Sequence, residues 1–251
     1  MKKIWITGAS SGIGRALAFK FAKEGWQVAV SARRKNLLEE MSSFNNNIFS
    51  FPLDVTDSKN CDDVFCQIKD KFIDMDMAIF CAGTHNPESE KNFNLQNIKK
   101  IMNINFYGTI NCINPIYSFF KNKKKGHVAI ISSVAGYRGL PSSGAYSASK
   151  AALTTLSESL YFDFNRFNIK ISIINPGFIK TSITDKNRFY MPMLKSPDFA
   201  AKKIFIGLTK KNNFEIHFPK PFTYLMKMIK FLPDIFYFKL LLILNKYIFK
   251  R

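Results

Sequence analysis

The chain of 251 residues carries 37 lysines and arginines against 18 acidic residues, for a formal net charge of +19. Its 47% of hydrophobic and 22% of charged residues are the balance of a soluble globular protein with a substantial core. The four cysteines, Cys61, Cys66, Cys81 and Cys112, have no metal-ligand spacing, which argues against a metal site and favours reduced, buried thiols.

The positive charge suits nucleic acid, an anionic membrane surface or a phosphorylated cofactor. A composition rich in Lys, Asn, Ile and Phe, residues with AT-rich codons, explains part of the charge equally well, so charge alone selects no partner. Met1-Lys2-Lys3 leads directly into the short apolar run Ile4–Ile6 and a glycine turn. A cleavable secretory signal needs a longer apolar stretch, so we expect a cytoplasmic protein.

Strand-like apolar runs alternate with helix-period segments as far as about residue 180, which predicts an α/β fold with a doubly wound parallel sheet. The predicted strands are Lys3–Thr7, Gln27–Ala32, Ile48–Leu53, Met77–Cys81, His127–Ser132 and Lys170–Asn175. The predicted helices include Arg15–Glu24, Ser58–Phe72 and Tyr146–Phe162. With no repeat or linker, residues 1–220 are expected to form a single Rossmann-like catalytic domain, and residues 221–251 a C-terminal helical extension.

A glycine-rich segment separates the first predicted strand from the first predicted helix. Glycines in this position let the backbone turn tightly and bring a pyrophosphate close to the amides at the helix N-terminus. The segment therefore predicts a dinucleotide site that includes Gly8, Ser10, Ser11, Gly12, Ile13 and Gly14.

The end of the second strand determines which dinucleotide is expected. Ala32 stands where an NAD site places an acidic residue, and Arg33 and Arg34 follow it. Without a carboxylate, a guanidinium can pair with a 2′-phosphate, so we predict NADP(H), with Arg33 as the phosphate ligand. The alternative is that both arginines form a solvated turn. Asp54-Val55 ends the third strand, where the carboxylate suits an adenine amino group or simply forms a turn.

Six short motifs occur in order along the chain: Gly8-x3-Gly12-x-Gly14, Cys81-Ala82-Gly83, Asn105-Phe106-Tyr107-Gly108, Ser132-Ser133-Val134-Ala135-Gly136, Tyr146-x3-Lys150 and Pro176-Gly177. With these motifs in register, the chain from about residue 3 to 185 resembles the short-chain dehydrogenase/reductase family. The resemblance implies a catalytic set of Asn105, Ser133, Tyr146 and Lys150. It also implies that Ala82, Gly83, Tyr146, Lys150, Pro176, Gly177, Ile179 and Thr181 contact the cofactor.

The predicted catalytic roles agree with side-chain chemistry. Tyr146 and Lys150 share one helix face, and a nearby ammonium lowers the pKa of a phenol toward the range useful for proton transfer. The resemblance implies that Ser133, which is preferred over Ser132 by its spacing of 13 residues from Tyr146, steadies the substrate oxygen. It implies further that Asn105 holds a water in a proton relay. Cys81 departs from the asparagine common in the family, at a position expected to support the backbone.

The segment Ser182–Lys195 is predicted to cover the substrate, and Ser196-Pro197-Asp198 to start a helix. Its apolar side chains suit a hydrophobic substrate, although core packing explains them about as well. They are Phe189, Tyr190, Met191, Met193 and Leu194.

Composition changes after residue 200. From Ala201 to Arg251 there are 11 lysines and arginines against 2 acidic residues, a net of +9, among many aromatic residues. Phe214–Phe218 is a candidate last strand, and Pro233-Asp234 a helix start. On that helix Lys239, Lys246 and Lys250 form a narrow basic stripe on an apolar surface, which suits a membrane interface. A dimer interface or a packed groove helix is the alternative, whereas nucleic-acid binding is not expected.

These observations predict an NADP(H)-dependent enzyme that transfers hydride between nicotinamide and a carbonyl or secondary alcohol of a hydrophobic, lipid-like substrate. The protein is expected to form a homodimer or homotetramer and to lie peripherally at the inner face of a membrane. The competing hypothesis is a catalytically idle, membrane-attached module that binds NADP(H) as a sensor or interaction partner.

Overall fold

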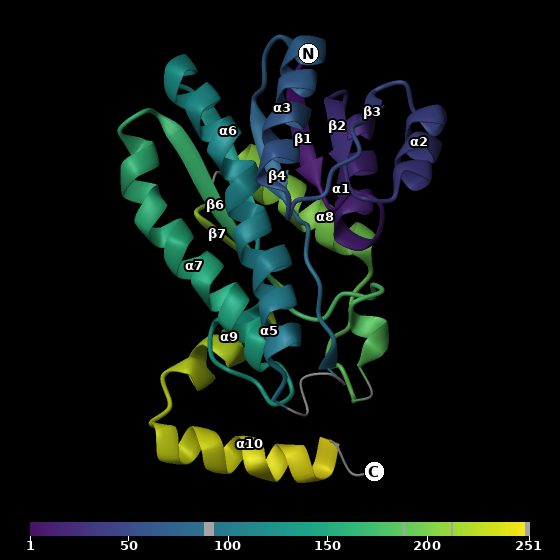
Figure 1. The fold of residues 1–251 in the computed structure, drawn as a ribbon. Coiled ribbons are helices and arrows are strands. Elements are labelled where there is room, and N and C mark those ends of the chain that lie inside the picture. The colour runs from purple at the N-terminus through teal and green to yellow at the C-terminus, as the bar shows by residue number, and fades with distance from the viewer. Residues whose placement is uncertain (88–92, 188, 212, 249–251) are drawn as a thin grey trace.

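Seven strands form one parallel sheet in the computed structural model, which describes residues 1–87, 93–187, 189–211 and 213–248, with the side chains of 245–248 outside the description (Figure 1). The strands are β1 (Lys3–Thr7), β2 (Gln27–Ser31), β3 (Ile48–Ser50), β4 (Met77–Phe80), β5 (Gly126–Ile131), β6 (Ile169–Pro176) and β7 (Glu215–Phe218). The described helices are α1 (Gly12–Lys23), α2 (Lys35–Phe44), α3 (Ser58–Phe72), α5 (Leu95–Met102), α6 (Gly108–Lys123), α7 (Gly144–Asn165), α8 (Pro197–Ile206), α9 (Lys220–Lys230) and α10 (Asp234–Ile248).

The strands lie in the order β3-β2-β1-β4-β5-β6-β7. From β1 the chain adds strands toward one edge of the sheet, and from β4 it adds them toward the other edge. Crossovers on opposite faces of the sheet leave a crevice at such a switch point, outside the carboxyl ends of the strands. The loops that follow β1 and β4 meet there. This is the doubly wound α/β fold that the sequence predicts.

Two apolar layers hold the sheet between its helices. Ile4 and Ile6 of β1 pack on one face with α1, α2 and α8, whereas Trp5 packs on the other face with α3, α6 and α7. Alternate side chains of a strand point to opposite faces, so both sides of a central strand must be apolar. The two layers make the central strands a rigid support for the loops at their carboxyl ends.

Most predicted elements are present, with shifts of a few residues at their ends. Among the strands the third differs most, since it ends at Ser50 instead of Leu53. Pro52 has no amide hydrogen to donate, yet Phe51 N and Leu53 N still donate to Val30 O and Ala32 O at 2.9 and 3.0 Å. The segment therefore continues beside β2 after its regular ladder has ended. Ser196 caps α8 as predicted, because its hydroxyl accepts from Phe199 N at 3.2 Å.

The C-terminal extension is helical, and α9 begins at Lys220, one residue before the predicted boundary. The predicted start of the last helix at Pro233-Asp234 is also found. Figure 1 shows α10 lying across one end of the molecule, beyond α9 and apart from the helices that cover the sheet. Lys250 lies outside the described residues, as does the side chain of Lys246. No helix within the described parts of the chain has the length and hydropathy to cross a membrane.

Candidate active site

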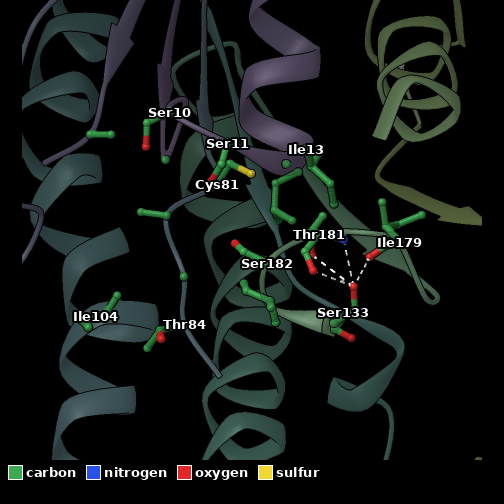
Figure 2. Close-up of a pocket in the computed structure, with 18 of the residues that line it drawn as sticks. Ser10, Ser11, Ile13, Cys81, Thr84, Ile104, Ser133, Ile179, Thr181 and Ser182 are labelled. Carbon is green, nitrogen blue, oxygen red and sulfur yellow. Dashed lines mark hydrogen bonds between the residues drawn. The ribbon is translucent and has the colours of Figure 1, made fainter. Parts of the chain in front are cut away.

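A cavity of about 440 Å³ opens at the switch point, and residues from both halves of the sheet line it (Figure 2). It contains all the predicted cofactor residues except Gly14, and three of the four predicted catalytic residues. Those lining it are Gly8, Ser10, Ser11, Gly12, Ile13, Arg33, Asp54, Val55, Ala82, Gly83, Ser133, Tyr146, Lys150, Pro176, Gly177, Ile179 and Thr181. Asn105 lies behind the wall.

The glycine loop requires glycine for conformation and for space. Gly8 and Gly12 have φ values of +66° and +56°, in the region that side chains disfavour. A Cβ on Gly14 would lie 2.4 Å from Gly8 O, so Gly14 allows α1 to pack against the loop from behind the cavity. A Cβ on Gly12 would meet Thr181 Cγ2 at 3.0 Å. The loop thus leaves a bare backbone beside the N-terminus of α1, which fits the pyrophosphate of a dinucleotide.

The two arginines after β2 lie on the rim of the cavity and are exposed. Arg34 donates from Nη2 to Ser10 Oγ at 2.8 Å and to Ser11 Oγ at 2.7 Å, and from Nε to Ser10 Oγ at 3.1 Å. Arg34 therefore links the end of β2 to the glycine loop and holds a positive charge there. The sequence predicts only Arg33 as a cofactor ligand, although the adjacent basic pair is a signal that also points to Arg34.

Asp54 has a clear structural role at the edge of the cavity. Its Oδ1 accepts from Thr56 N at 3.0 Å and from Thr56 Oγ1 at 2.8 Å, the pattern of a turn-forming aspartate. The turn positions Val55, which also lines the cavity. Binding of an adenine amino group by Asp54 remains a prediction.

Tyr146 and Lys150 lie one turn apart on α7, with Lys150 Nζ 5.7 Å from the centre of the Tyr146 ring. Lys150 is buried, and its Nζ donates to Ile131 O at 2.9 Å. Burial lowers the pKa of Lys150 from 10.5 to about 8, although the neighbouring Cys81 opposes this shift. Its ammonium therefore remains the prevailing form at neutral pH, close to the phenol.

His85 was not identified from the sequence. Its ring lies 4.4 Å from that of Tyr146, centre to centre, at an angle of 36°. His85 belongs to the loop after β4 and is buried. A lone histidine after the Cys81-Ala82-Gly83 motif carries no signal in the sequence, because only the crossover of the sheet brings it to Tyr146.

The two adjacent serines after β5 have different surroundings. Ser132 is buried, and its hydroxyl donates to Lys150 O at 2.8 Å, so it holds β5 against α7. Ser133 is only half-buried, and its hydroxyl oxygen accepts from Ala135 N at 3.1 Å, which leaves its proton available to a cavity ligand. Ser133 therefore stays the predicted catalytic serine, and Ser132 has a structural role.

Asn105 lies in a π-helical turn, Asn103–Tyr107, between α5 and α6. Its Oδ1 accepts from Thr84 N at 2.7 Å, while its Nδ2 donates to Thr84 O and Ser149 Oγ, each at 3.0 Å. The side chain therefore fastens the loop after β4 to α7. π-helical turns often occur at functional sites. The water relay attributed to Asn105 stays a prediction.

The segment after β6 forms the remaining wall. Thr184 Oγ1 donates to Ile179 O at 2.6 Å and accepts from Thr181 N at 2.9 Å; these are among the dashed bonds beside Thr181 and Ile179 in Figure 2. A Cβ on Gly177 would lie 2.8 Å from the ring of Phe222 in α9. The C-terminal extension thus packs directly behind the cavity wall. Lining residues outside the prediction include Thr84, Ile104, Ile183, Thr184 and Lys186.

The fold and this cavity together define a dinucleotide-binding α/β protein. The family model for short chain dehydrogenase matches residues 2–190, and the chain belongs to that family. The chain is therefore an oxidoreductase of a family that uses a nicotinamide cofactor, as the six motifs predict.

The relatives agree with this assignment. An uncharacterized oxidoreductase of Myxococcus xanthus is 30% identical over 233 residues, which cover 91% of this chain and 92% of the relative. An Arabidopsis thaliana protein named 11-beta-hydroxysteroid dehydrogenase-like 2 is 33% identical over 86% of this chain and 73% of its own. The solved structure of ElxO with NADP bound has a TM-score of 0.76 and 27% identity, over 86% of this chain and 97% of that chain.

Proposed function

We propose that the protein is an NADP(H)-dependent reductase or dehydrogenase that acts on a carbonyl or secondary alcohol of a hydrophobic substrate. The observation that carries the proposal is the placement of Tyr146 and the Lys150 ammonium in the cavity that also contains the glycine loop and Arg33. An enzyme needs both a cofactor-binding site and a proton donor. A catalytically idle module needs only the binding site.

The charge at the end of β2 supports NADP(H) over NAD(H). Ala32 offers no carboxylate to a ribose hydroxyl, and Arg33 and Arg34 present two guanidinium groups at the cavity rim. Guanidinium groups bind phosphate oxygens in a bidentate manner. The ElxO structure, solved with NADP bound, adds support from a relative.

The mechanism follows from the positions of the side chains. A nicotinamide held by the glycine loop, Lys150 and the segment after β6 would supply hydride to the carbonyl carbon, or accept it in the reverse direction. In the reductive direction Tyr146 donates its phenolic proton to the substrate oxygen, and the Lys150 ammonium stabilises the phenolate that remains. Ser133 donates a hydrogen bond to the same oxygen as negative charge develops there. Lys150, held by Ile131 O, and Asn105, which braces the loop after β4, keep this arrangement fixed.

Exposed apolar side chains in the segment predicted to cover the substrate support a hydrophobic substrate. Tyr190, Met193 and Leu194 all belong to Ser182–Lys195 and are exposed. Ile183 and Lys186 of the same segment line the cavity. Exposed apolar surface in a segment that also lines the cavity is stabilised when an apolar ligand covers it.

We also propose a homodimer or homotetramer. A groove of about 400 Å³ lies between α6 and α7 and is lined mainly by apolar side chains, including Ile113, Tyr117 and Leu160. Light scattering of the purified protein tests this proposal, and a monomer at all concentrations would contradict it.

The decisive experiment measures NADPH oxidation against long-chain 3-keto, steroid-like and small aldehyde substrates in parallel, with Tyr146→Phe as the matched variant. Removing the hydroxyl of a general acid should lower kcat by at least roughly 100-fold while NADPH binding is retained. Binding of NADPH without turnover of any carbonyl would instead favour the idle module.

A further inference from the structure

The C-terminal helices α9 and α10 expose an unusual amount of apolar surface. Ten of the 21 exposed large apolar side chains among the described residues lie between Tyr224 and Leu244. Phe231 at the junction of the helices is 82% exposed, and Ile235 is 76% exposed. Exposed apolar patches of this kind mark interaction surfaces. We call the outward side of these two helices the tail face; its members are Tyr224, Leu225, Met228, Phe231, Ile235, Phe236, Phe238, Lys239, Leu242 and Ile243.

The tail face is presented by a helix that is anchored to the domain. The Tyr237 side chain is buried, and its hydroxyl donates to Gly139 O. The Arg138 guanidinium lies 3.8 Å from the centre of the Tyr237 ring, donates to Leu232 O at 2.6 Å and forms an ion pair with Asp234. With Tyr237 turned inward, Ile235, Lys239 and Leu242 lie within about 60° of one another on the opposite, outward side, at 100° per residue.

A second set of contacts holds α9 in place. Glu215 of β7 accepts hydrogen bonds from Lys227 of α9, from Tyr137 at 2.5 Å and from Asn175 at 2.9 Å. Burial opposes ionisation, but these three donors hold the pKa of Glu215 below its ordinary value. Tyr137 and Arg138 belong to the loop that joins Ser133 to Tyr146. The tail face is therefore fixed in orientation relative to the catalytic residues.

The distribution of charge on the tail face distinguishes between two partners, a second copy of the chain and an anionic membrane. Asp234 is the only acidic residue after Glu215 in the sequence, and both carboxylates have cationic partners within the protein. Lys239 stands among apolar side chains in the middle of the outward side of α10, and Lys230 is exposed at the end of α9. Against the tail face of a second copy of the chain, Lys239 would be buried without a partner. At an anionic bilayer its ammonium reaches the headgroups while the apolar side chains enter the acyl boundary.

We infer that the tail face docks on an anionic membrane surface. Docking holds the loop between Ser133 and Tyr146 directly behind α10, on the side of the helix away from the lipid. The wall behind Gly177 is held by α9 in the same way, since Phe222 contacts Phe178 with ring centres 5.5 Å apart. An apolar substrate can then reach the cavity from the bilayer. Supply of substrate from the lipid rests on the proposed function, whereas docking does not.

Cosedimentation of the full-length protein with vesicles tests the inference without cofactor or substrate, so its outcome is independent of the proposed reaction. The vesicles are phosphatidylglycerol mixed with phosphatidylcholine, and phosphatidylcholine alone. The protein should pellet with the anionic vesicles and less at high salt. The variant Ile235→Ser/Phe238→Ser/Leu242→Ser should reduce pelleting by at least roughly ten-fold, since each change removes apolar area that enters the lipid.

The matched control is Phe44→Ser/Ile73→Asn, which also removes exposed apolar side chains but at the opposite end of the sheet, before β3 and β4. It should pellet like the unchanged protein. Lys239→Glu keeps the apolar side chains and should weaken binding to anionic vesicles only, which gives a second test should the triple variant misfold. The inference is wrong if the unchanged protein does not pellet, if all variants pellet equally, or if the triple variant converts a larger assembly to a monomer without vesicles.

Discussion

The glycine loop after β1 lines the candidate active site and the helix pair α9–α10 lies behind its wall, and the two regions are built in opposite ways. The loop has little side-chain bulk, and the position of its backbone is determined by two positive φ values and by the close approach of Gly14 to Gly8 O. The helix pair is crowded with large apolar side chains, and a few polar contacts, chiefly those of Arg138, attach it to the domain.

This difference shows what each region can recognise. A bare backbone at a helix N-terminus binds one chemical group, a pyrophosphate, with fixed geometry. An apolar helix surface with isolated lysines has no such geometry and binds a class of surface. We therefore expect the cofactor side of the molecule to select its ligand by shape, and the tail side to select a surface by its composition. Three predictions test this contrast, in order of decreasing effect.

The largest effect is expected at the arginine pair. Loss of a charge-assisted hydrogen bond costs about 1.5–3 kcal/mol, so Arg33→Ala should raise the KM for NADPH roughly 10- to 100-fold while the KM for NADH changes little. Arg34→Ala should weaken both cofactors, because it also releases Ser10 and Ser11. Steady-state kinetics with both cofactors measures the two patterns.

The control for this pair is Lys35→Ala. Lys35 is the next cation along the chain, but it is paired with Glu39 at 3.5 Å and does not line the cavity. Its substitution should leave both KM values unchanged. An equal rise for NADPH and NADH in Arg33→Ala would show that Arg33 does not contact the 2′-phosphate.

The same contrast explains how much the sequence could predict. Strand positions, the glycine loop and the pairing of Tyr146 with Lys150 follow from short-range patterns, since period, turn chemistry and helical spacing are local. The position of His85 against Tyr146 depends on the crossover between β4 and α7, which no local pattern encodes. The anchoring of α10 by Arg138 is also non-local, because the partners are 96 residues apart in sequence.

Local patterns also leave the assignment of equivalent side chains open. Arg33 and Arg34 are adjacent and chemically identical, and only the bonds of Arg34 to Ser10 and Ser11 distinguish their roles. In the same way, the bond from Ser132 to Lys150 O distinguishes it from Ser133. The structure therefore adds most where two residues of one type compete for a single role.

An intermediate effect on stability is expected when the buried ammonium of Lys150, on the cofactor side of the molecule, is removed. Because burial lowers the pKa of Lys150 to about 8, the folded protein binds its proton less readily than the unfolded chain. The free-energy cost of burying the ammonium is fully present below pH 8. The free energy of unfolding of the unchanged protein therefore rises as pH increases from 8 to 10.5. Lys150→Met should thus stabilise the cofactor-free protein by about 1–3 kcal/mol at pH 7.

Urea unfolding of both proteins at pH 7 and pH 10 measures this difference, which should shrink at the higher pH. Lys170→Met is a suitable control, because Lys170 is an exposed lysine on β6. A variant that is less stable than the unchanged protein at pH 7 would show that the bond from Lys150 to Ile131 O outweighs the cost of burying the ammonium.

The smallest effect is expected at the tail, where Arg138→Met removes the donor to Leu232 O and the partner of Asp234 while keeping much of the side-chain bulk. The loss of these hydrogen bonds and of the contact with Tyr237 should lower the local stability of α10 by about 1–2 kcal/mol. Hydrogen exchange should show faster exchange in α10 and unchanged protection in β1 and α1, because the two regions share no contacts through Arg138. Lys170→Met, at an exposed lysine of β6 that lies outside both cavities, serves as the control. If loosening α10 also exposed the glycine loop to exchange, the two regions would form one cooperative unit, and the division between a rigid cofactor side and a separately anchored tail would be wrong.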